Sequence, residues 1–192
     1  MPRHYKMNKR AETAEETRGR IVRATYALHV ERGIGATSVR DIAERADVSP
    51  GTVYHHFPEY DDVVVACGKF TFETTRPPTR EIFEGIETPG DRLRVLVEET
   101  FDFYRRFPSY ERVRFEREEF EPVEHAVAAD ERNRRALIQM AIAPNRPGKR
   151  AIAVAYALLD ISVYHRLLGS GVSRAAAIDE IHRLLEQRLL GL

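Results

Sequence analysis

Polar side chains that donate or accept hydrogen bonds are concentrated in one short segment. It reads Ser49-Pro50-Gly51-Thr52-Val53-Tyr54-His55-His56. At about 100° per residue on a helix, four of these residues share one face, which consists of Gly51, Thr52, Tyr54 and His55. The face holds no long aliphatic chain, so it is suited to polar contacts rather than to packing in a core. Such a face suits a helix that lies in the major groove of DNA.

Other kinds of chemistry have little support in the sequence. There is no Gly-rich phosphate loop, no His-Glu-x-x-His metal motif and no nucleophile elbow. The adjacent His55 and His56 are not three or four residues apart, as metal ligands on one helix are, so contact with DNA or local packing explains them better than zinc. His125 and His165 are isolated, which is more typical of structural histidines. We therefore expect no enzyme activity, no metal and no cofactor.

Two short helices joined by a tight turn must position this polar face. The first has an apolar stripe at spacings of three and four, formed by Val39, Ile42, Ala43 and Ala46. Ser38 with Asp41 three residues later has the form of a capping box, and Thr37 could cap equally well. Ser49 is a strong N-cap candidate because Pro50 then occupies the first helical position.

Residue identity sharpens this interpretation. The run Thr37-Ser38-Val39-Arg40-Asp41-Ile42-Ala43, followed after a turn by Ser49-Pro50-Gly51-Thr52-Val53-Tyr54-His55-His56-Phe57, closely resembles the N-terminal domain of the TetR family of transcriptional repressors. The resemblance covers roughly residues 17–65, and the rest of the chain matches only by its helical layout. It implies an all-α fold, with a three-helix helix-turn-helix DNA-binding domain followed by a helical domain for ligand binding and dimerisation.

The chain also departs from the family pattern. The turn usually carries Gly where this chain has Asp47, a residue that tolerates the left-handed conformation. After the second helix the family usually has a Ser or Asn cap followed by a Lys that contacts a phosphate, whereas this chain has Glu59 and Tyr60. An acidic side chain near the DNA backbone weakens binding. A phosphate contact from the start of the next helix is therefore not assured.

We hypothesise two groups of contacts with double-stranded DNA. Phosphate contacts are expected from Thr37, Ser38, Ser49, Tyr54 and a basic N-terminal arm. Base contacts are expected from Arg40, Gly51, Thr52 and His55, and His56 completes the set of predicted DNA-binding residues. The chain has 30 basic and 30 acidic side chains, so attraction to phosphate must come mainly from the arm and the first helix.

The sequence predicts three parts. Residues 1–12 form a flexible basic arm, which either contacts DNA or is a solvated tail, residues 13–58 form the helix-turn-helix domain, and residues 59–192 form the helical ligand-binding and dimerisation domain. The first helix begins at the cap Thr13 and stops at Gly33. The charged stretch 111–121 is expected to be a solvated helix with intrahelical ion pairs.

Several residues of the last part are candidate ligand contacts. Aromatic residues near 101–104 either line a pocket or pack in the core. Asp130 and Arg134, four apart, either pair at the surface or recognise a polar group of a ligand. On an apolar helix from Ala151 to Leu168, three residues at spacings of four form one polar line. The predicted ligand contacts are Phe101, Tyr104, Arg134, Tyr156, Asp160 and Tyr164.

The two C-terminal helices, at about residues 150–190, are very apolar for a chain this small and suggest an interface with a second copy. The resemblance to TetR-like proteins implies a homodimer through these helices. A two-fold axis would place two DNA-reading helices about 34–36 Å apart on a pseudo-palindromic operator. Cys67 is the only cysteine, there is no secretory signal, and the longest apolar run is half a membrane span. We expect a cytoplasmic, ligand-responsive repressor released by an unknown small-molecule effector. The alternative is a helical small-molecule receptor with weak or lost DNA binding.

Overall fold

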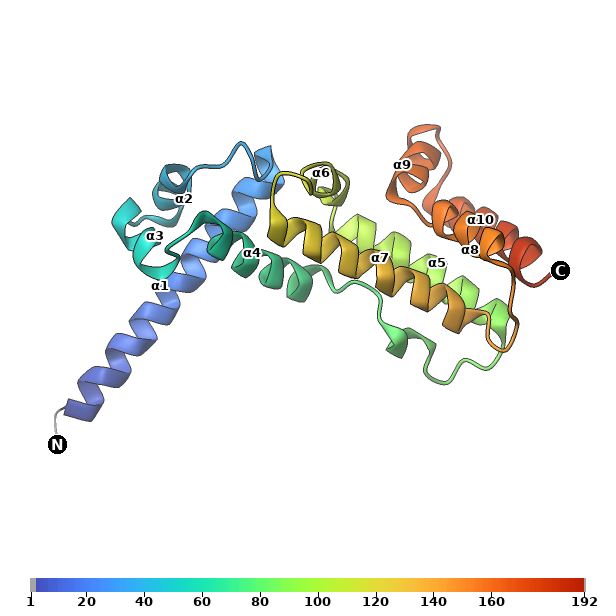
Figure 1. Cartoon of the computed structure of the whole chain (residues 1–192), viewed down its shortest axis with the longest axis horizontal. Coiled ribbons are helices and arrows are strands. Elements are labelled where there is room, and N and C mark those ends of the chain that lie inside the picture. Colours follow the sequence, from blue (N-terminus) through green and yellow to red (C-terminus); the bar gives the residue numbers. More distant parts are fainter. Residues whose placement is uncertain (1–2, 192) are drawn as a thin grey trace. The chain divides into compact units, whose positions relative to one another are not determined.

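The computed structural model describes the backbone of residues 3–191 and the side chains of residues 13–191 (Figure 1). Within this part of the chain there are ten α-helices, one short 3-10 helix and no strand, which confirms the predicted all-α fold. The first four helices are α1 (Arg3–Arg32), α2 (Val39–Ala46), α3 (Pro50–His56) and α4 (Tyr60–Thr75). They are followed by η1 (Arg80–Phe83), α5 (Pro89–Arg106), α6 (Tyr110–Phe115), α7 (Glu121–Ala141), α8 (Lys149–Leu158), α9 (Ile161–Gly169) and α10 (Arg174–Leu189).

The chain divides into two compact units. One contains the residues through Thr74 together with Arg112–Ala126, and the other contains Thr75–Glu111 and the residues from Val127 onward. The sequence placed the boundary at residue 58 instead. The boundary lies later because Val63 and Ala66 of α4 are buried in the same core as α1, α2 and α3.

Helix α1 starts earlier than the sequence indicated. The segment expected to be an arm is helical from Arg3, and neither proline nor glycine interrupts the chain between Arg3 and Gly19. Thr13 lies inside the helix and is not its N-cap, and its carbonyl accepts a hydrogen bond of 2.9 Å from the Thr17 hydroxyl. The helix ends before Gly33, as expected, and Gly33 has a φ of +96°.

The helix-turn-helix core forms as the apolar pattern predicts. Figure 1 shows α2 and α3 beside α1. Their shared core consists of fully or nearly fully buried side chains, among them Ile21, Leu28, Ile42, Val53 and Phe57. Since the apolar stripes of all three helices face this core, their remaining faces are left for solvent or a partner.

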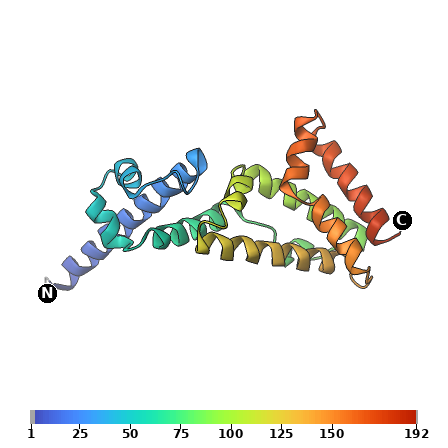
Figure 2. The same ribbon diagram turned by 45° about the horizontal axis from the view of Figure 1, so that its top comes forward.

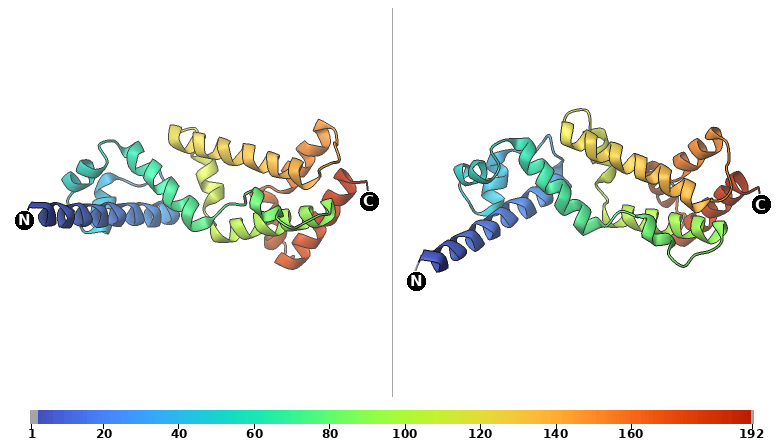
Figure 3. Two further views of the ribbon diagram at one scale, coloured as in Figure 1. Left: turned by 90° about the horizontal axis from the view of Figure 1, so that it is seen from below. Right: turned by 60° about the horizontal axis from the view of Figure 1, so that its bottom comes forward.

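In the second unit, α7 runs along α5, and α8–α10 form the C-terminal part (Figures 2 and 3). The single helix expected from Ala151 to Leu168 is wrong. The chain bends by 47° between α8 and α9. Asp160 causes the break, since its carboxylate accepts a hydrogen bond of 2.9 Å from the Ser162 backbone N–H and so caps α9.

In the part of the chain that the structure describes, no single helix is both long and apolar enough to cross a membrane. Among the described residues, α8 and α9 taken together are long and apolar enough by length and composition alone, but the pair is bent.

Candidate functional site

The turn between α2 and α3 is fixed by caps on both sides. Ser38 and Asp41 form the predicted capping box, in which each residue bonds the backbone of the other. Asp47 ends α2 in the left-handed conformation with a φ of 53°, as the tolerance of Asp for this region allows. Ser49 caps α3 by accepting a hydrogen bond of 3.1 Å from the Thr52 N–H. The backbone of α3 is therefore held in place before any ligand binds.

The outward face of α3 is exposed. Gly51, Tyr54 and His55 are exposed, and Tyr54 has an exposed fraction of 52%. Thr52 is half-buried, and its hydroxyl lies 2.9 Å from that of Ser49. Burial, followed by the charges of His55 and Arg18, lowers the pKa of His56. These positions fit the expected DNA contacts, which stay predictions because the structure contains no DNA.

Thr37 does not fit its predicted role. Its side chain is only 6% exposed, and its hydroxyl donates a hydrogen bond of 2.7 Å to the carbonyl of Gly33. The single O–H of this residue is therefore committed inside the turn that follows α1, and it is not free to donate to a phosphate. Thr37 holds this turn together instead.

Arg40 is the exposed cation of α2 that has no ion-pair partner among the described residues. The charges of two nearby arginines are neutralised by ion pairs. Arg45 pairs with Glu31 at 2.8 Å, and Arg32 lies 3.4 Å from Asp41. The hydrogen bonds from Arg45 lower the pKa of Glu31. Electrostatic attraction from α2 toward an anion must therefore come from Arg40.

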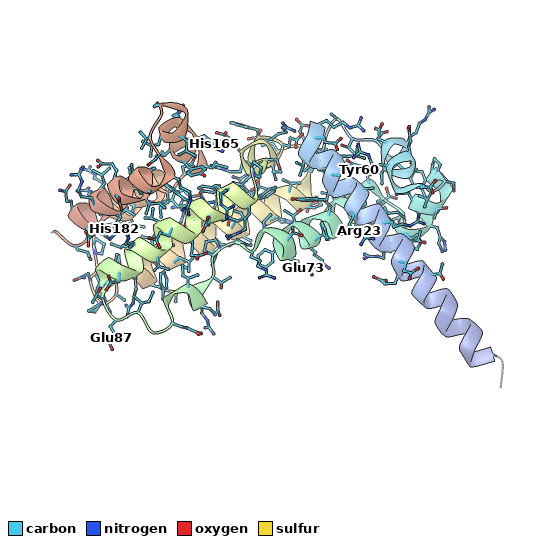
Figure 4. The ribbon with its side chains drawn as sticks, turned by 180° about the vertical axis from the view of Figure 1, so that it is seen from behind. Arg23, Tyr60, Glu73, Glu87, His165 and His182 are labelled. Carbon is cyan, nitrogen blue, oxygen red and sulfur yellow. The ribbon has the colours of Figure 1, made fainter. Side chains whose placement is uncertain are left out.

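Tyr60 points into the fold and not toward a phosphate. Its hydroxyl donates a hydrogen bond of 2.9 Å to the Ile34 carbonyl and lies 3.2 Å from His29 Nε2. On the other side of the imidazole, His29 Nδ1 lies 3.5 Å from the Cys67 sulfur. Figure 4 labels Tyr60 at the start of α4. Burial raises the pKa of Tyr60, lowers that of His29 to about 4 and raises that of Cys67 to about 11.

The returning segment 112–116 contacts the same turn, which the sequence did not predict. The Glu116 carboxylate accepts hydrogen bonds from the backbone N–H groups of Ile34, at 3.0 and 3.1 Å, and Gly35, at 3.3 Å. Arg112 donates to the Val30 carbonyl at 3.2 Å. The stretch 111–121 is therefore not the solvated helix that its alternating charges indicated. Its helix α6 ends at Phe115, and Arg117 pairs with Glu124 of α7 at 2.5 Å.

The second unit contains a buried arginine at the centre of a tyrosine cluster. Arg134 is only 3% exposed, so its pair with Asp130 is not the surface pair that was one of our two expectations. Its guanidinium donates to the hydroxyls of Tyr104 at 2.6 Å and Tyr110 at 2.7 Å. Burial works against the charged form, but the hydroxyl of Tyr104 and the carboxylate of Asp130 hold the pKa of Arg134 above its usual range.

Four of the other five predicted ligand contacts, which are Phe101, Tyr104, Tyr156 and Tyr164, lie in one cluster with this arginine. The ring of Tyr164 lies 4.8 Å from that of Phe101 and 5.8 Å from that of Tyr104, and the Tyr156 ring lies 5.5 Å from the Arg134 guanidinium. Asp160 is the exception, because its carboxylate caps α9. Tyr156, Asp160 and Tyr164 therefore do not form one polar line on a single helix. Tyr110 belongs to the cluster, and only its aromatic type could have indicated this.

Comparison with known proteins agrees with the geometry of the first unit. Residues 21–67 match the family model described as bacterial regulatory proteins, tetR family. This segment is therefore similar to the N-terminal domain of that family. The chain is 30% identical over 96 residues to the transcriptional repressor KstR2 of Mycobacterium tuberculosis, an alignment that covers 50% of this chain and 48% of the relative. It is 27% identical over 177 residues to the repressor KstR of Rhodococcus jostii, covering 88% of this chain and 80% of that protein.

Solved structures support the fold along most of the chain. A transcriptional regulator from Rhodococcus has a TM-score of 0.69 at 18% identity, and the match covers 91% of this chain and 96% of that one. The chain spans about half the length of the curated relatives at 30% identity. The family model and both relatives are named for the regulation of transcription and not for an enzyme activity.

Within the segment that matches the family model, the start of α4 lacks the phosphate-binding side chains that the resemblance implies. Glu59, Asp61 and Asp62 are exposed there, and the Asp62 carboxylate accepts a hydrogen bond of 3.0 Å from the Glu59 N–H. Since Tyr60 is turned inward, this end of the helix presents acidic groups only. They oppose binding to a DNA phosphate.

Proposed function

We propose that the protein is a transcriptional repressor that reads double-stranded DNA with α3. The observation that carries this proposal is the exposed polar face of α3, held by caps at Ser38 and Ser49 in a segment that matches the tetR family model. Two relatives named as repressors support the direction of regulation. Since its partner is chromosomal DNA, we infer that the protein acts in the cytoplasm.

The proposed contacts follow from exposure and from chemistry. Arg40, Gly51, Thr52 and His55 would contact bases, and an additional Cβ at Gly51 would meet no atom nearer than the Ser49 hydroxyl, at 3.7 Å. A base edge can therefore approach the backbone there. Phosphate contacts are proposed for exposed or half-buried groups of the same surface, which are Ser38, Ser49, Tyr54 and His56. The arm residues lie outside the described side chains.

We propose a homodimer that forms through residues 150–190 and binds a pseudo-palindromic operator. Support comes from α8, where Val154 has an exposed fraction of 39% within one chain, whereas Ile178, Ile181 and Leu185 of α10 are already buried in it. A two-fold axis through these helices would present two copies of α3 to successive major grooves. A small-molecule effector bound at the tyrosine cluster would release DNA by favouring one of two dimer shapes.

One observation favours a second candidate function. The acidic start of α4 and the compensated charges of Arg32 and Arg45 leave little attraction for phosphate. On this basis the protein would be a helical small-molecule receptor with weak or lost DNA binding.

Selection of sheared genomic DNA separates these two functions. We expect the purified protein to enrich a few short inverted repeats. Arg40→Ala should relax sequence selectivity at one base pair of each half-site, with an effect of about 1–3 kcal/mol. Arg80→Ala is the matched control, since it removes an exposed arginine from η1 that pairs with Glu81. A receptor without DNA binding would enrich no repeat, and unchanged selectivity of Arg40→Ala would remove Arg40 from the base contacts.

A further inference from the structure

Arg134 is a buried charge whose presence needs an explanation. It comes from α7, and the residues around it come from α5, α6 and α8. Its partner Asp130 lies closer to solvent, with 19% of its side chain exposed against 4% for Arg134. The ion pair is therefore asymmetric. The cation is fixed at the centre of the cluster and the anion lies at its edge.

Stability does not account for this arrangement. Burial of an ion pair costs about as much as the attraction returns, and apolar residues of similar volume often stabilise a core more. Arg134 is instead arranged for recognition, because a planar guanidinium offers paired N–H donors that match the two oxygens of a carboxylate. The hydroxyls of Tyr104 and Tyr110 fix its orientation.

A second, exposed arginine lies on the ring of Tyr156. Arg135 is exposed, and its guanidinium lies 4.4 Å from the centre of the Tyr156 ring, which Arg134 also approaches. Arg135 has no ion-pair partner among the described residues. It would attract an anion toward the ring that stands beside the buried charge.

We propose that the Arg134 cluster is a binding site for an organic carboxylate, whose carboxylate group takes the place of Asp130 on Arg134 while its apolar body contacts the rings of Phe101, Tyr156 and Tyr164. This inference rests on the proposed function only in taking the cluster as the effector site. In the ligand-free protein, Asp130 then occupies the position of the effector carboxylate, and a bound ligand displaces it.

When a ligand carboxylate replaces Asp130, the ion pair of Arg134 and the hydrogen bond from Tyr110 are both kept. Asp130 moves from the edge of the cluster into water, and the ligand supplies the buried negative charge, so that Arg134 stays neutralised. The Tyr110 hydroxyl, which donates to Asp130, donates to the ligand carboxylate instead. Because Asp130 competes for Arg134, it lowers the affinity for every carboxylate, and its removal should raise that affinity.

Binding can be measured by thermal unfolding of the full chain without DNA. The probes are benzoate, 3-phenylpropionate and octanoate, each compared with its uncharged amide. We expect the carboxylates to raise the Tm of the wild-type protein saturably and the amides to have no such effect. Asp130→Ala should bind the carboxylates at least about tenfold more tightly, since the competing side chain is gone.

A double variant provides the control. Asp130→Leu combined with Arg134→Met replaces the pair with apolar side chains, a change that buried ion pairs commonly tolerate. It should show no preference for carboxylates over amides. If Asp130→Ala folds and binds carboxylates no better than the wild type, the displacement of Asp130 is refuted.

If Asp130→Ala does not fold, comparison of the wild type with the double variant tests whether the carboxylate site exists. Equal responses of these two proteins to every carboxylate and amide would refute the site. The measurement contains no DNA, so failure here leaves the proposed repressor untouched, and failure to enrich an operator leaves the carboxylate site untouched.

Discussion

Lowering the pH should destabilise the first unit through one residue, His29. The imidazole is buried, with Nε2 facing the Tyr60 hydroxyl at 3.2 Å and Nδ1 facing the Cys67 sulfur at 3.5 Å. Since the Tyr60 hydroxyl already donates to Ile34, a neutral His29 donates from Nε2 and accepts at Nδ1. Protonation would put a second N–H where the Cys67 thiol now donates, in a site away from water.

The magnitude follows from the shift in pKa. Burial lowers the pKa of His29 from 6.5 to about 4 in the folded chain, a difference of about 2.5 units. At 1.36 kcal/mol for each unit, this corresponds to a loss of about 3 kcal/mol. Between these two pH values the unfolded chain binds more protons than the folded chain. The contribution is therefore complete above pH 6.5 and is lost as the pH falls toward about 4.

Urea unfolding between pH 7.5 and 4.5 measures this loss. Over this interval the free energy of unfolding should fall further for the wild type than for His29→Leu, which has no imidazole to protonate. The difference should be most of the expected loss of about 3 kcal/mol. Carboxylates with lowered pKa values, such as Asp41, are common to both chains and cancel in the difference. His125→Leu, at a side chain that is 74% exposed, should follow the wild type. Equal pH dependence of the wild type and His29→Leu would refute the reasoning.

Two further predictions concern the turn after α1. Glu116→Gln keeps the shape of the side chain but removes the charge that accepts from Ile34 and Gly35, so the free energy of unfolding should fall by about 1–2 kcal/mol; an unchanged urea midpoint would contradict the role of this carboxylate. Gly33→Ala should destabilise by more than about 1 kcal/mol, because φ is +96° and the added Cβ would lie 2.5 Å from a Glu116 oxygen. Gly68→Ala, its control within α4, meets nothing within 4 Å and should stabilise by up to about 1 kcal/mol, and equal effects of both variants would contradict this account.

The features that the sequence predicted correctly depend on neighbouring residues. The caps at Ser38 and Ser49 and the stop at Gly33 each involve residues within a few positions of one another. An apolar stripe and a cap determine a helix and its buried face almost without regard to the rest of the chain. Helices α2 and α3 could therefore be placed within a residue or two.

The break at Asp160 is a local feature that the apolar pattern concealed. Hydrophobic residues continue through α8 and α9, so periodicity alone predicted one helix. Asp has low helix propensity and is a strong N-cap, and its position ten residues into the apolar run was the available signal. Weight given to this residue would have separated the two helices.

The roles of Glu116 and Arg134 depend on contacts that the sequence does not reveal. Glu116 bonds a backbone N–H 82 residues earlier in the chain. Arg134, four residues after Asp130, has the spacing of an ordinary surface pair, and only the packing of α5 and α6 against it makes the pair buried. Alternating charges and i, i+4 pairs look the same in sequence whether they lie in water or in a core.

The same turn connects these observations to the direction of α3. Between Val30 and Gly35, two carbonyls and two N–H groups bond side chains from outside the helix-turn-helix, namely Tyr60, Arg112 and Glu116. This turn ends α1 and leads into α2, so a change in its backbone would redirect α2 and then α3. The match to the tetR model ends at residue 67 and includes Tyr60 but not Arg112 or Glu116. The placement of the face that we propose for DNA reading therefore depends on contacts from Arg112 and Glu116, which lie outside the segment that matches the family model.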